Sequence, residues 1–265
     1  MNYDLLLTLR YAERGGPRLA RVKEIRAPEP GRPMLLFVHG FNVDQGHAMR
    51  QWNSVASLIT PDPRVQRGPF LWPSDLNRYR SIGRLTYPKV VEPARECGRL
   101  LADYLQRRGN HPCVLIGHSL GSLVVLAAAD RLRGSLTGLG LVGAAVAVSE
   151  MERITGQYGL RLAHTEAVGF SPRDPVLKRP FDMGNWLSAP WTPRSEAVGL
   201  HGAPADRPWG HRQDFEINHH AHWQEEAFGA FTAAVLGTMA VRKPSAAQRP
   251  RERRVRTRPS RREAG

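Results

Sequence analysis

Short apolar segments follow one another along the chain, separated by longer segments in which polar and apolar residues alternate with helical spacing. The apolar segments end at Gly, Pro or polar residues, which is typical of the strands of an α/β fold. Strands are predicted within residues 33–42, 68–74, 113–116, 136–148, 164–175 and 213–217. The first of these segments is continuously apolar up to its glycine turn, which predicts a strand buried on both faces, as in a parallel sheet.

Amphipathic segments between these strands predict helices within residues 46–59, 87–109, 122–130 and 222–240. Pro93 lies inside the second of these segments and is expected to kink the helix or to mark a late start. Near the N-terminus, residues 3–12 and 18–27 flank a Gly-Gly-Pro turn, which predicts an antiparallel pair of strands. The whole pattern predicts an α/β fold, with a mostly parallel central sheet and helices on both faces.

The composition is typical of one globular domain. The chain has 265 residues, 41% of them hydrophobic, which is enough for one sizeable core. No apolar run reaches the roughly 18 residues that a membrane-spanning helix needs, and the first residues lack a basic leader with a cleavage site. We therefore expect a cytoplasmic protein. The two cysteines, Cys97 and Cys113, are expected to be buried thiols.

Basic residues gather at the C-terminal end. The formal net charge is +14, and residues 242–265 hold ten basic residues against only Glu252 and Glu263. This segment has almost no large apolar residues, so we expect a flexible, solvated tail. The alternative is an electrostatic contact with nucleic acid or an anionic surface. The chain is therefore divided into a folded domain, residues 1–241, and a basic, Arg-rich disordered tail, residues 242–265.

Residues 117–121, Gly-His-Ser-Leu-Gly, match the nucleophile-elbow pattern Gly-x-Ser-x-Gly between a predicted strand and a predicted helix. A turn from strand to helix within two residues strains the backbone at Ser119, and it requires flanking residues without clashing side chains. Such a turn raises the Ser119 hydroxyl above the sheet edge, where it can act as a nucleophile. A serine that only caps a helix is the weaker alternative.

A nucleophilic serine needs a base and two N–H donors for the oxyanion. The N–H of Leu120, at the start of the helix, is one candidate donor. The N–H of Phe41, in the segment Phe-Val-His-Gly-Phe-Asn at residues 37–42, is the other. His39 is a candidate base in that segment, but its position between a strand and a tight turn favours a hydrogen-bonding role that holds the loop.

The segments Val-His-Gly-Phe-Asn and Gly-His-Ser-Leu-Gly, in this order, resemble the α/β-hydrolase superfamily. With its asparagine, the first segment looks most like that of a bacterial subset of these proteins that is little characterised. The resemblance covers roughly residues 30–240, and it implies an eight-stranded, mostly parallel sheet, a Ser-Asp-His triad in that chain order and no cofactor. Only residues 149–164 separate the strand after the elbow helix from the next strand, so no large cap domain is expected.

An acid that orients the base should follow a strand after the elbow. Asp174 comes four residues after an apolar strand and lies between Pro172 and Pro175. The alternative role for Asp174 is that of a turn residue before a proline. Glu166 lies inside the strand and Asp182 lies beyond the loop, so both are poorer candidates for the acid.

Three histidines, His219, His220 and His222, follow the last predicted strand. In the resembling family the catalytic histidine is followed by a small residue and then by aromatic residues. When this order is matched to His220-Ala221-His222-Trp223, it selects His220 as the base. His219 is the second candidate and His222 the third. A metal site of His220 and His222 with His211 or Asp214 is less favoured, because no second cluster of ligands completes it.

Together these residues predict a serine hydrolase that cleaves a small-molecule carboxylic ester through an acyl-enzyme intermediate, without metal or cofactor. Ser119 is the expected nucleophile, His220 the base and Asp174 the acid that orients it. Thioester or amide hydrolysis and acyl transfer would use the same residues. A further alternative is a non-catalytic binding protein whose basic tail tethers it to nucleic acid or to a membrane. The loop 175–211, rich in Trp and Pro, is expected to line the substrate pocket.

Overall fold

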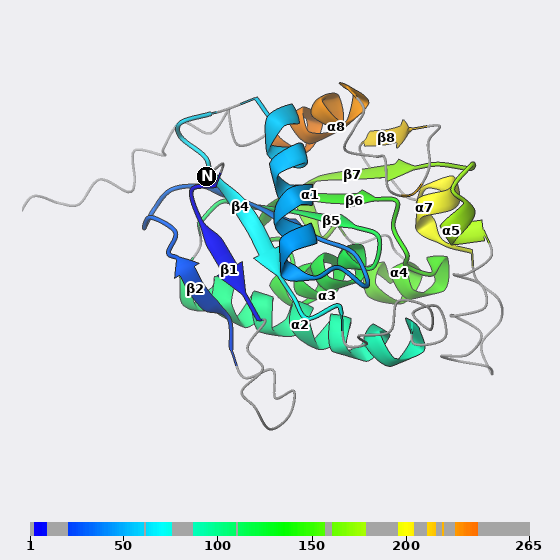
Figure 1. The fold of residues 1–265 in the computed structure, drawn as a ribbon, viewed down its shortest axis with the longest axis horizontal. Helices are drawn as coiled ribbons and strands as arrows, with labels where there is room; N and C mark the ends of the chain where they lie inside the picture. Colours follow the sequence, from blue (N-terminus) through cyan, green and yellow to red (C-terminus); the bar gives the residue numbers. More distant parts are fainter. Residues whose placement is uncertain are drawn as a thin grey trace, which may run out of the picture.

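The computed structural model describes residues 3–9, 21–60, 62–75, 87–109, 111–156, 161–178, 196–203, 211–215, 219 and 226–237. Its centre is an eight-stranded sheet with the order β2-β1-β4-β3-β5-β6-β7-β8 (Figure 1). The strands are β1 (Leu6–Thr8), β2 (Lys23–Arg26), β3 (Met34–Val38), β4 (Gln66–Leu71), β5 (Cys113–His118), β6 (Leu136–Val142), β7 (Ala163–Phe170) and β8 (His211–Asp214). Neighbouring strands pair in parallel except for β1 and β2 at one edge, which confirms the predicted antiparallel opening pair.

Helices cover both faces of this sheet (Figure 1). The described helices are α1 (Gln45–Leu58), α2 (Tyr87–Arg107), α3 (Gly121–Leu132), α4 (Val148–Thr155), α5 (Pro175–Lys178), α7 (Val198–His201) and α8 (Glu226–Leu236). Side chains of α1 and α8 pack on one face, and those of α2 and α3 pack on the other. The predicted α/β fold with a mostly parallel sheet and helices on both faces is therefore confirmed.

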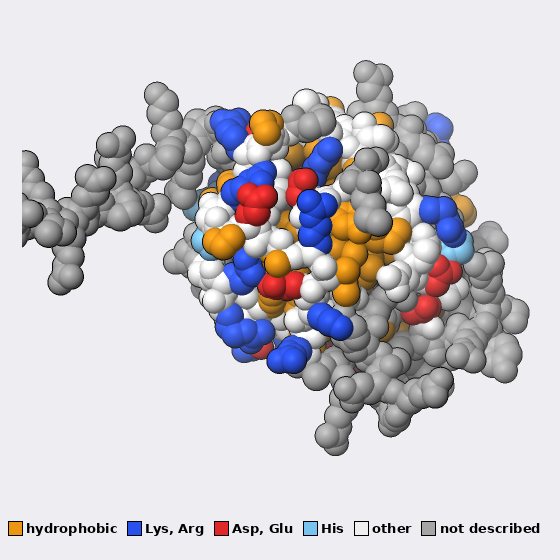
Figure 2. Space-filling view, turned by 60° about the vertical axis from the view of Figure 1, so that its left-hand side comes forward, with side chains coloured by type: hydrophobic (Ala, Val, Ile, Leu, Met, Phe, Trp, Pro, Cys, Tyr) orange, Lys and Arg blue, Asp and Glu red, His pale blue; other side chains and the backbone are white. Residues whose placement is uncertain are grey.

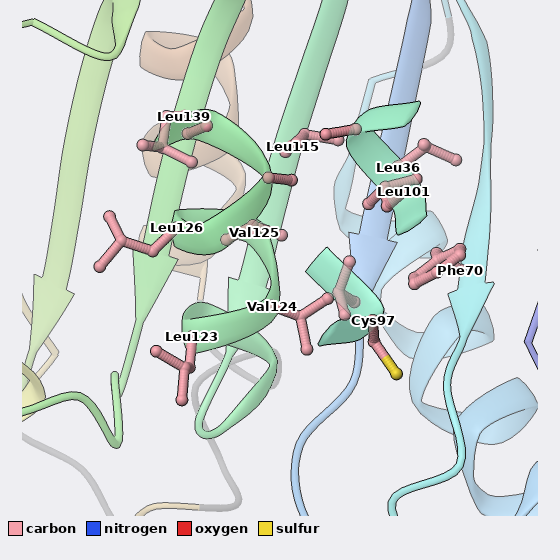
Figure 3. Close-up of a cluster of buried hydrophobic side chains, with 14 of the residues drawn as sticks. Leu36, Phe70, Cys97, Leu101, Leu115, Leu123, Val124, Val125, Leu126 and Leu139 are labelled. Carbon is pink, nitrogen blue, oxygen red and sulfur yellow. The ribbon is translucent and has the colours of Figure 1, made fainter. Parts of the chain in front are cut away.

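The two faces of the sheet hold the hydrophobic core. The strands β3, β5 and β6 are buried along their whole length, in agreement with their largely apolar sequences. Figure 3 shows the layer between the sheet and the helices α2 and α3, where Leu36 and Leu115 come from strands and Leu101 and Val124 from helices. All four side chains are fully buried, and burial of each stabilises the fold by about 1.5–3 kcal/mol.

The two cysteines lie in this core as free, buried thiols, as the sequence predicts. Burial raises the pKa of the Cys97 and Cys113 thiols to about 12. Both side chains therefore stay protonated near neutral pH and pack as small apolar groups.

Several elements differ from the sequence-based expectation in their bounds. The helix α2 begins at Tyr87 and continues through Pro93, so the proline does not mark a late start. The strand β8 begins at His211, two residues before the predicted segment. The short helices α4, α5 and α7 lie in segments for which no helix is predicted. In the segment between β6 and β7, α4 takes up residues 148–155, so no large cap domain fits there.

Charged side chains on the described surface form mixed pairs of both signs. Arg108 donates to Glu24 at 2.7 Å, and Arg95 contacts both Glu92 and Glu150. On the face drawn in Figure 2, Lys and Arg side chains are interspersed with Asp and Glu side chains.

The basic segment 242–265 lies outside the described residues, so the division of the chain at residue 241 stays a prediction. No helix in the described part of the chain is long and apolar enough to cross a bilayer.

Candidate active site

Ser119 occupies a strained turn between the end of β5 and the start of α3. Its φ angle is 54°, in the left-handed region that non-glycine residues rarely adopt. Hydrogen bonds over-determine this conformation, because the Ser119 N–H donates to the Val142 carbonyl at 3.0 Å and its carbonyl accepts from the Ala145 N–H at 3.1 Å. The neighbouring strand β6 and the loop after it therefore hold the elbow from one side.

Glycines surround the elbow because main chains approach it closely. A Cβ at Gly117 would lie 2.6 Å from the Ser122 Cα, and a Cβ at Gly121 would lie 2.4 Å from the Val38 and His39 carbonyl oxygens. Both distances are far below van der Waals contact and involve backbone atoms, so no side chain fits at either position. The steric reason for the Gly-x-Ser-x-Gly spacing is thus present in the structure.

His219 connects Asp174 to Ser119. Its Nδ1 lies 2.6 Å from Oδ2 of Asp174, and its Nε2 lies 2.7 Å from Oγ of Ser119. Because a carboxylate only accepts, Nδ1 carries the proton toward Asp174, and Nε2 can accept the Ser119 hydroxyl proton. The Asp174 and His219 side chains are only 0% and 3% exposed, so water does not compete for these bonds.

A second set of hydrogen bonds fixes the Asp174 carboxylate. Its Oδ1 accepts from the N–H of Val176 at 2.9 Å and from the N–H of Leu177 at 3.1 Å. These are the second and third residues of α5, so Asp174 is the N-cap of that helix and Pro175 is its first residue. With Oδ1 engaged in this way, Oδ2 is directed at His219.

His39 holds the loop that follows β3. Its Nε2 accepts from the Trp72 N–H at 3.3 Å, and its carbonyl accepts from the Trp72 indole N–H at 2.7 Å. Because Nε2 accepts, Nδ1 carries the proton and donates to the Gly40 carbonyl at 3.0 Å. The two rings also stack with centroids 5.9 Å apart. These contacts occupy both ring nitrogens of His39, in agreement with a loop-holding role.

One candidate oxyanion donor follows Ser119 directly in the chain, and the other comes from a loop beside it. Leu120 is buried at the start of α3, and its N–H donates to no other residue in the described part of the chain. Phe41 follows Gly40, where an added Cβ would lie 2.9 Å from the Ser119 Cβ. The loop that carries Phe41 therefore runs directly beside the nucleophile candidate.

Glu166, the described alternative candidate for the acid, lies apart from this site. Glu166 accepts from the N–H groups of Leu162 and Ala163 at the start of β7, and burial raises the pKa of its carboxyl. Among the residues described, no three His, Cys, Asp or Glu side chains converge as metal ligands do. Asp182 and His222 lie outside the described residues.

The structure brings Ser119 and Asp174 together with His219, which is the second candidate for the base in the sequence analysis. His220 itself lies outside the described residues. The contacts of His219 with both partners favour the second candidate, which is one position earlier in the chain. Counting back from the next aromatic residue does not identify the catalytic histidine reliably, because loops vary in length. An insertion of one residue changes which side chain faces the site.

Sequence reasoning gave no role to His118, the variable residue of the elbow motif. Its Nε2 lies 2.9 Å from the main-chain oxygen of His219, and its side chain is buried. A large polar residue at the end of a strand that is otherwise apolar was the available signal.

The fold and these contacts together define an α/β hydrolase with a serine, a histidine and an acid in contact at the carboxyl ends of the strands. The chain belongs to the alpha/beta hydrolase family, whose model matches residues 35–259. No curated protein matches the chain.

Solved structures similar to this chain include two esterases. The catalytic core domain of acetyl xylan esterase from Trichoderma reesei is 12% identical with a TM-score of 0.47, and the match covers 79% of this chain and 98% of that one. Esterase PE8 is 17% identical with a TM-score of 0.43, and the match covers 78% of this chain and 94% of that one. The family assignment rests on the family model and on the geometry of the site.

Proposed function

We propose that this protein is a serine hydrolase that cleaves a carboxylic ester through an acyl-enzyme intermediate. The observation that supports this function is the continuous chain of hydrogen bonds from Asp174 through His219 to Ser119. An acid, an imidazole and a hydroxyl in this order make the hydroxyl nucleophilic at neutral pH. In this proposal His219, rather than His220, is the base.

Acylation begins when Nε2 of His219 takes the proton of the Ser119 hydroxyl as Oγ attacks the ester carbonyl carbon. The Asp174 carboxylate, held by the start of α5, stabilises the imidazolium that forms and keeps the ring in the required orientation. The tetrahedral intermediate then collapses, and the imidazolium gives its proton to the departing alcohol. The acyl group remains on Ser119.

The negative charge on the intermediate's oxygen needs two donors. We assign this role to the N–H groups of Leu120 and Phe41, and removal of one such donor typically costs about 100- to 1,000-fold in kcat. Deacylation repeats the sequence with water, which His219 deprotonates as it attacks the acyl carbon. The acid product leaves and Ser119 regains its proton.

A fluorophosphonate probe tests the nucleophile directly, because it forms a covalent bond only with an activated serine. We expect the wild type and Ser54→Ala, a change on the exposed face of α1, to label alike. Ser119→Ala should not label. An unlabelled wild-type protein would overturn the proposed function, and so would activity that a chelator abolishes and a metal ion restores.

The same residues support hydrolysis of a thioester or an amide and acyl transfer. An ester is proposed in preference to an amide because an alcohol is a better leaving group than an amine. Hydrolysis is proposed in preference to acyl transfer because water needs no specialised acceptor site. p-Nitrophenyl esters of increasing acyl length, compared by kcat/KM, would define the acyl group. If a matched thioester or amide were turned over faster, that compound and not the ester would be the proposed substrate.

We further propose that residues 1–241 carry the whole activity and that residues 242–265 form a solvated tail. A chain that ends at residue 241 should keep the wild-type kcat/KM. The high charge of the tail predicts that any affinity of the full chain for DNA falls steeply with salt and is lost on truncation. Loss of hydrolysis on truncation would contradict this division.

A further inference from the structure

His118 contacts the histidine of the site through its main chain. Its Nε2 lies 2.9 Å from the carbonyl oxygen of His219, across 101 residues of sequence. A carbonyl can only accept, so Nε2 of His118 carries a proton and donates it. The two imidazole rings lie with centroids 5.2 Å apart and are tilted by 47°. The residue before the nucleophile therefore holds the residue that acts as its base.

The other side of the His118 ring faces the loop that carries Phe41. A Cβ added at Gly40 would lie 3.3 Å from Nδ1 of His118 and 2.9 Å from Cβ of Ser119. The imidazole thus lies between this loop and the main chain of His219, and it is only 2% exposed. One rigid ring at the end of β5 spaces two segments that come from opposite ends of the chain.

We infer that His118 is a positioning residue of the active site, an inference that rests on the proposed function. His118 does not touch the reacting atoms, because its Nε2 is directed at the His219 carbonyl. Its hydrogen bond fixes the main chain of His219, which lies outside any helix or strand. Through that main chain it sets where Nε2 of His219 stands relative to Oγ of Ser119.

The expected size of the effect follows from the geometry of proton transfer. Displacement of a reacting group by about 1 Å costs up to about 100-fold in rate. Loss of the bond from His118 leaves the His219 side chain its bond to Asp174 but removes one restraint on its main chain. We therefore expect kcat to fall by about 10- to 100-fold and KM to change little, because the His118 side chain is buried and is directed at the main chain of His219.

Two amide substitutions at His118 distinguish the effect of the hydrogen bond from the effect of the ring volume. The amide nitrogen of Gln reaches the place of a histidine Nε2, whereas that of Asn reaches only the place of Nδ1. We expect His118→Gln to keep kcat within about threefold of the wild type and His118→Asn to lose the full 10- to 100-fold. His118→Leu should match His118→Asn, and if it does not fold, the two amides still decide the question.

The readouts are the rate of fluorophosphonate labelling, kcat and KM, with thermal unfolding to show that each variant is folded. We expect the Nδ1 proton of His219, which faces Asp174 at 2.6 Å, to resonate far downfield in the proton NMR spectrum of the wild type. This signal should broaden in His118→Asn and persist in His118→Gln. His164→Leu, the same type of change at an exposed position of β7, should alter none of these.

The inference and the proposed function fail in different ways. Equal kcat in folded His118→Asn, His118→Gln and wild-type protein would overturn the positioning role while the wild type still labels. Equal losses in the Asn and Gln variants would also overturn it, because the hydrogen bond would then not be the cause. A wild type that does not label would overturn the proposed function, and the positioning role with it.

Discussion

Nε2 of His219 lies 2.7 Å from Oγ of Ser119, although 100 residues separate them in the sequence. The fold explains this contact, because β5, β6, β7 and β8 are parallel neighbours. Their carboxyl ends meet at one edge of the sheet. Ser119 follows β5, Asp174 follows β7, and His219 follows β8. Parallel pairing thus brings three distant loops to one site.

The first prediction distinguishes two adjacent histidines. His219→Ala should reduce kcat by about 10⁴- to 10⁶-fold, as loss of the base does in serine hydrolases. His220→Ala is the matched change one position later and should keep most of the activity. Fluorophosphonate labelling and ester hydrolysis measure both variants. The opposite result, with activity lost only in His220→Ala, would return the base to the residue that the sequence favours.

The second prediction concerns Asp174. Asp174→Asn keeps an oxygen that can accept from Val176 and Leu177, so α5 should stay capped. Its amide group then faces His219 and favours the wrong tautomer, and we expect kcat to fall by about 10⁴-fold. Asp103→Asn, in a surface ion pair with Arg131, is the control and should leave kcat unchanged. Comparable kcat values for the two variants would remove Asp174 from the triad.

The strands and the elbow could be predicted because local sequence dictates them. β3 is continuously apolar, β5 is apolar up to Gly117, and both are buried along their length, as is typical of the interior of a parallel sheet. The elbow has two glycines where added Cβ atoms would meet backbone. The helices α5 and α7 could not be predicted, because each has four residues and shows no helical period.

The histidine register could not be predicted for a different reason. Adjacent histidines have the same chemistry, and the path of the chain between β8 and α8 decides which of them faces Ser119. Asp174 shows the converse case, because its side chain makes the contacts that both of its interpretations require, turn residue before proline and triad acid. Oδ1 caps α5 and Oδ2 meets His219.

The third prediction concerns the packing of the elbow against β3. Gly121→Ala would place a Cβ 2.4 Å from the Val38 and His39 carbonyl oxygens, which cannot move without disturbing the sheet. We expect the free energy of unfolding to fall by about 1–3 kcal/mol, as overpacking typically does. Gly237→Ala meets only ordinary van der Waals contacts and serves as the control. Equal urea midpoints for both variants would contradict the close approach.

The fourth prediction concerns pH and the attachment of α4. Glu150 accepts from Arg95 of α2 at 2.9 Å and from Arg153 at 3.0 Å. Burial by itself would raise the pKa of the Glu150 carboxyl, but hydrogen bonds and charge from Arg153 and Arg95 hold it below its usual range. The ionised carboxylate therefore stabilises the fold, and Glu150→Gln should lower the free energy of unfolding at pH 7 by about 1 kcal/mol.

The sign of the pH dependence follows from the lowered pKa of Glu150. The stabilisation is complete above the ordinary glutamate pKa of 4.5 and is lost as the pH falls through the lower pKa of the folded protein. Urea unfolding should thus show a gap between wild type and Glu150→Gln that is constant near neutral pH and closes in acid. Glu96→Gln, at an exposed pair with Arg99, should show a smaller gap near neutral pH. A Glu150→Gln gap that stays open in acid would mean that side-chain packing, and not the charge, attaches α4 to α2.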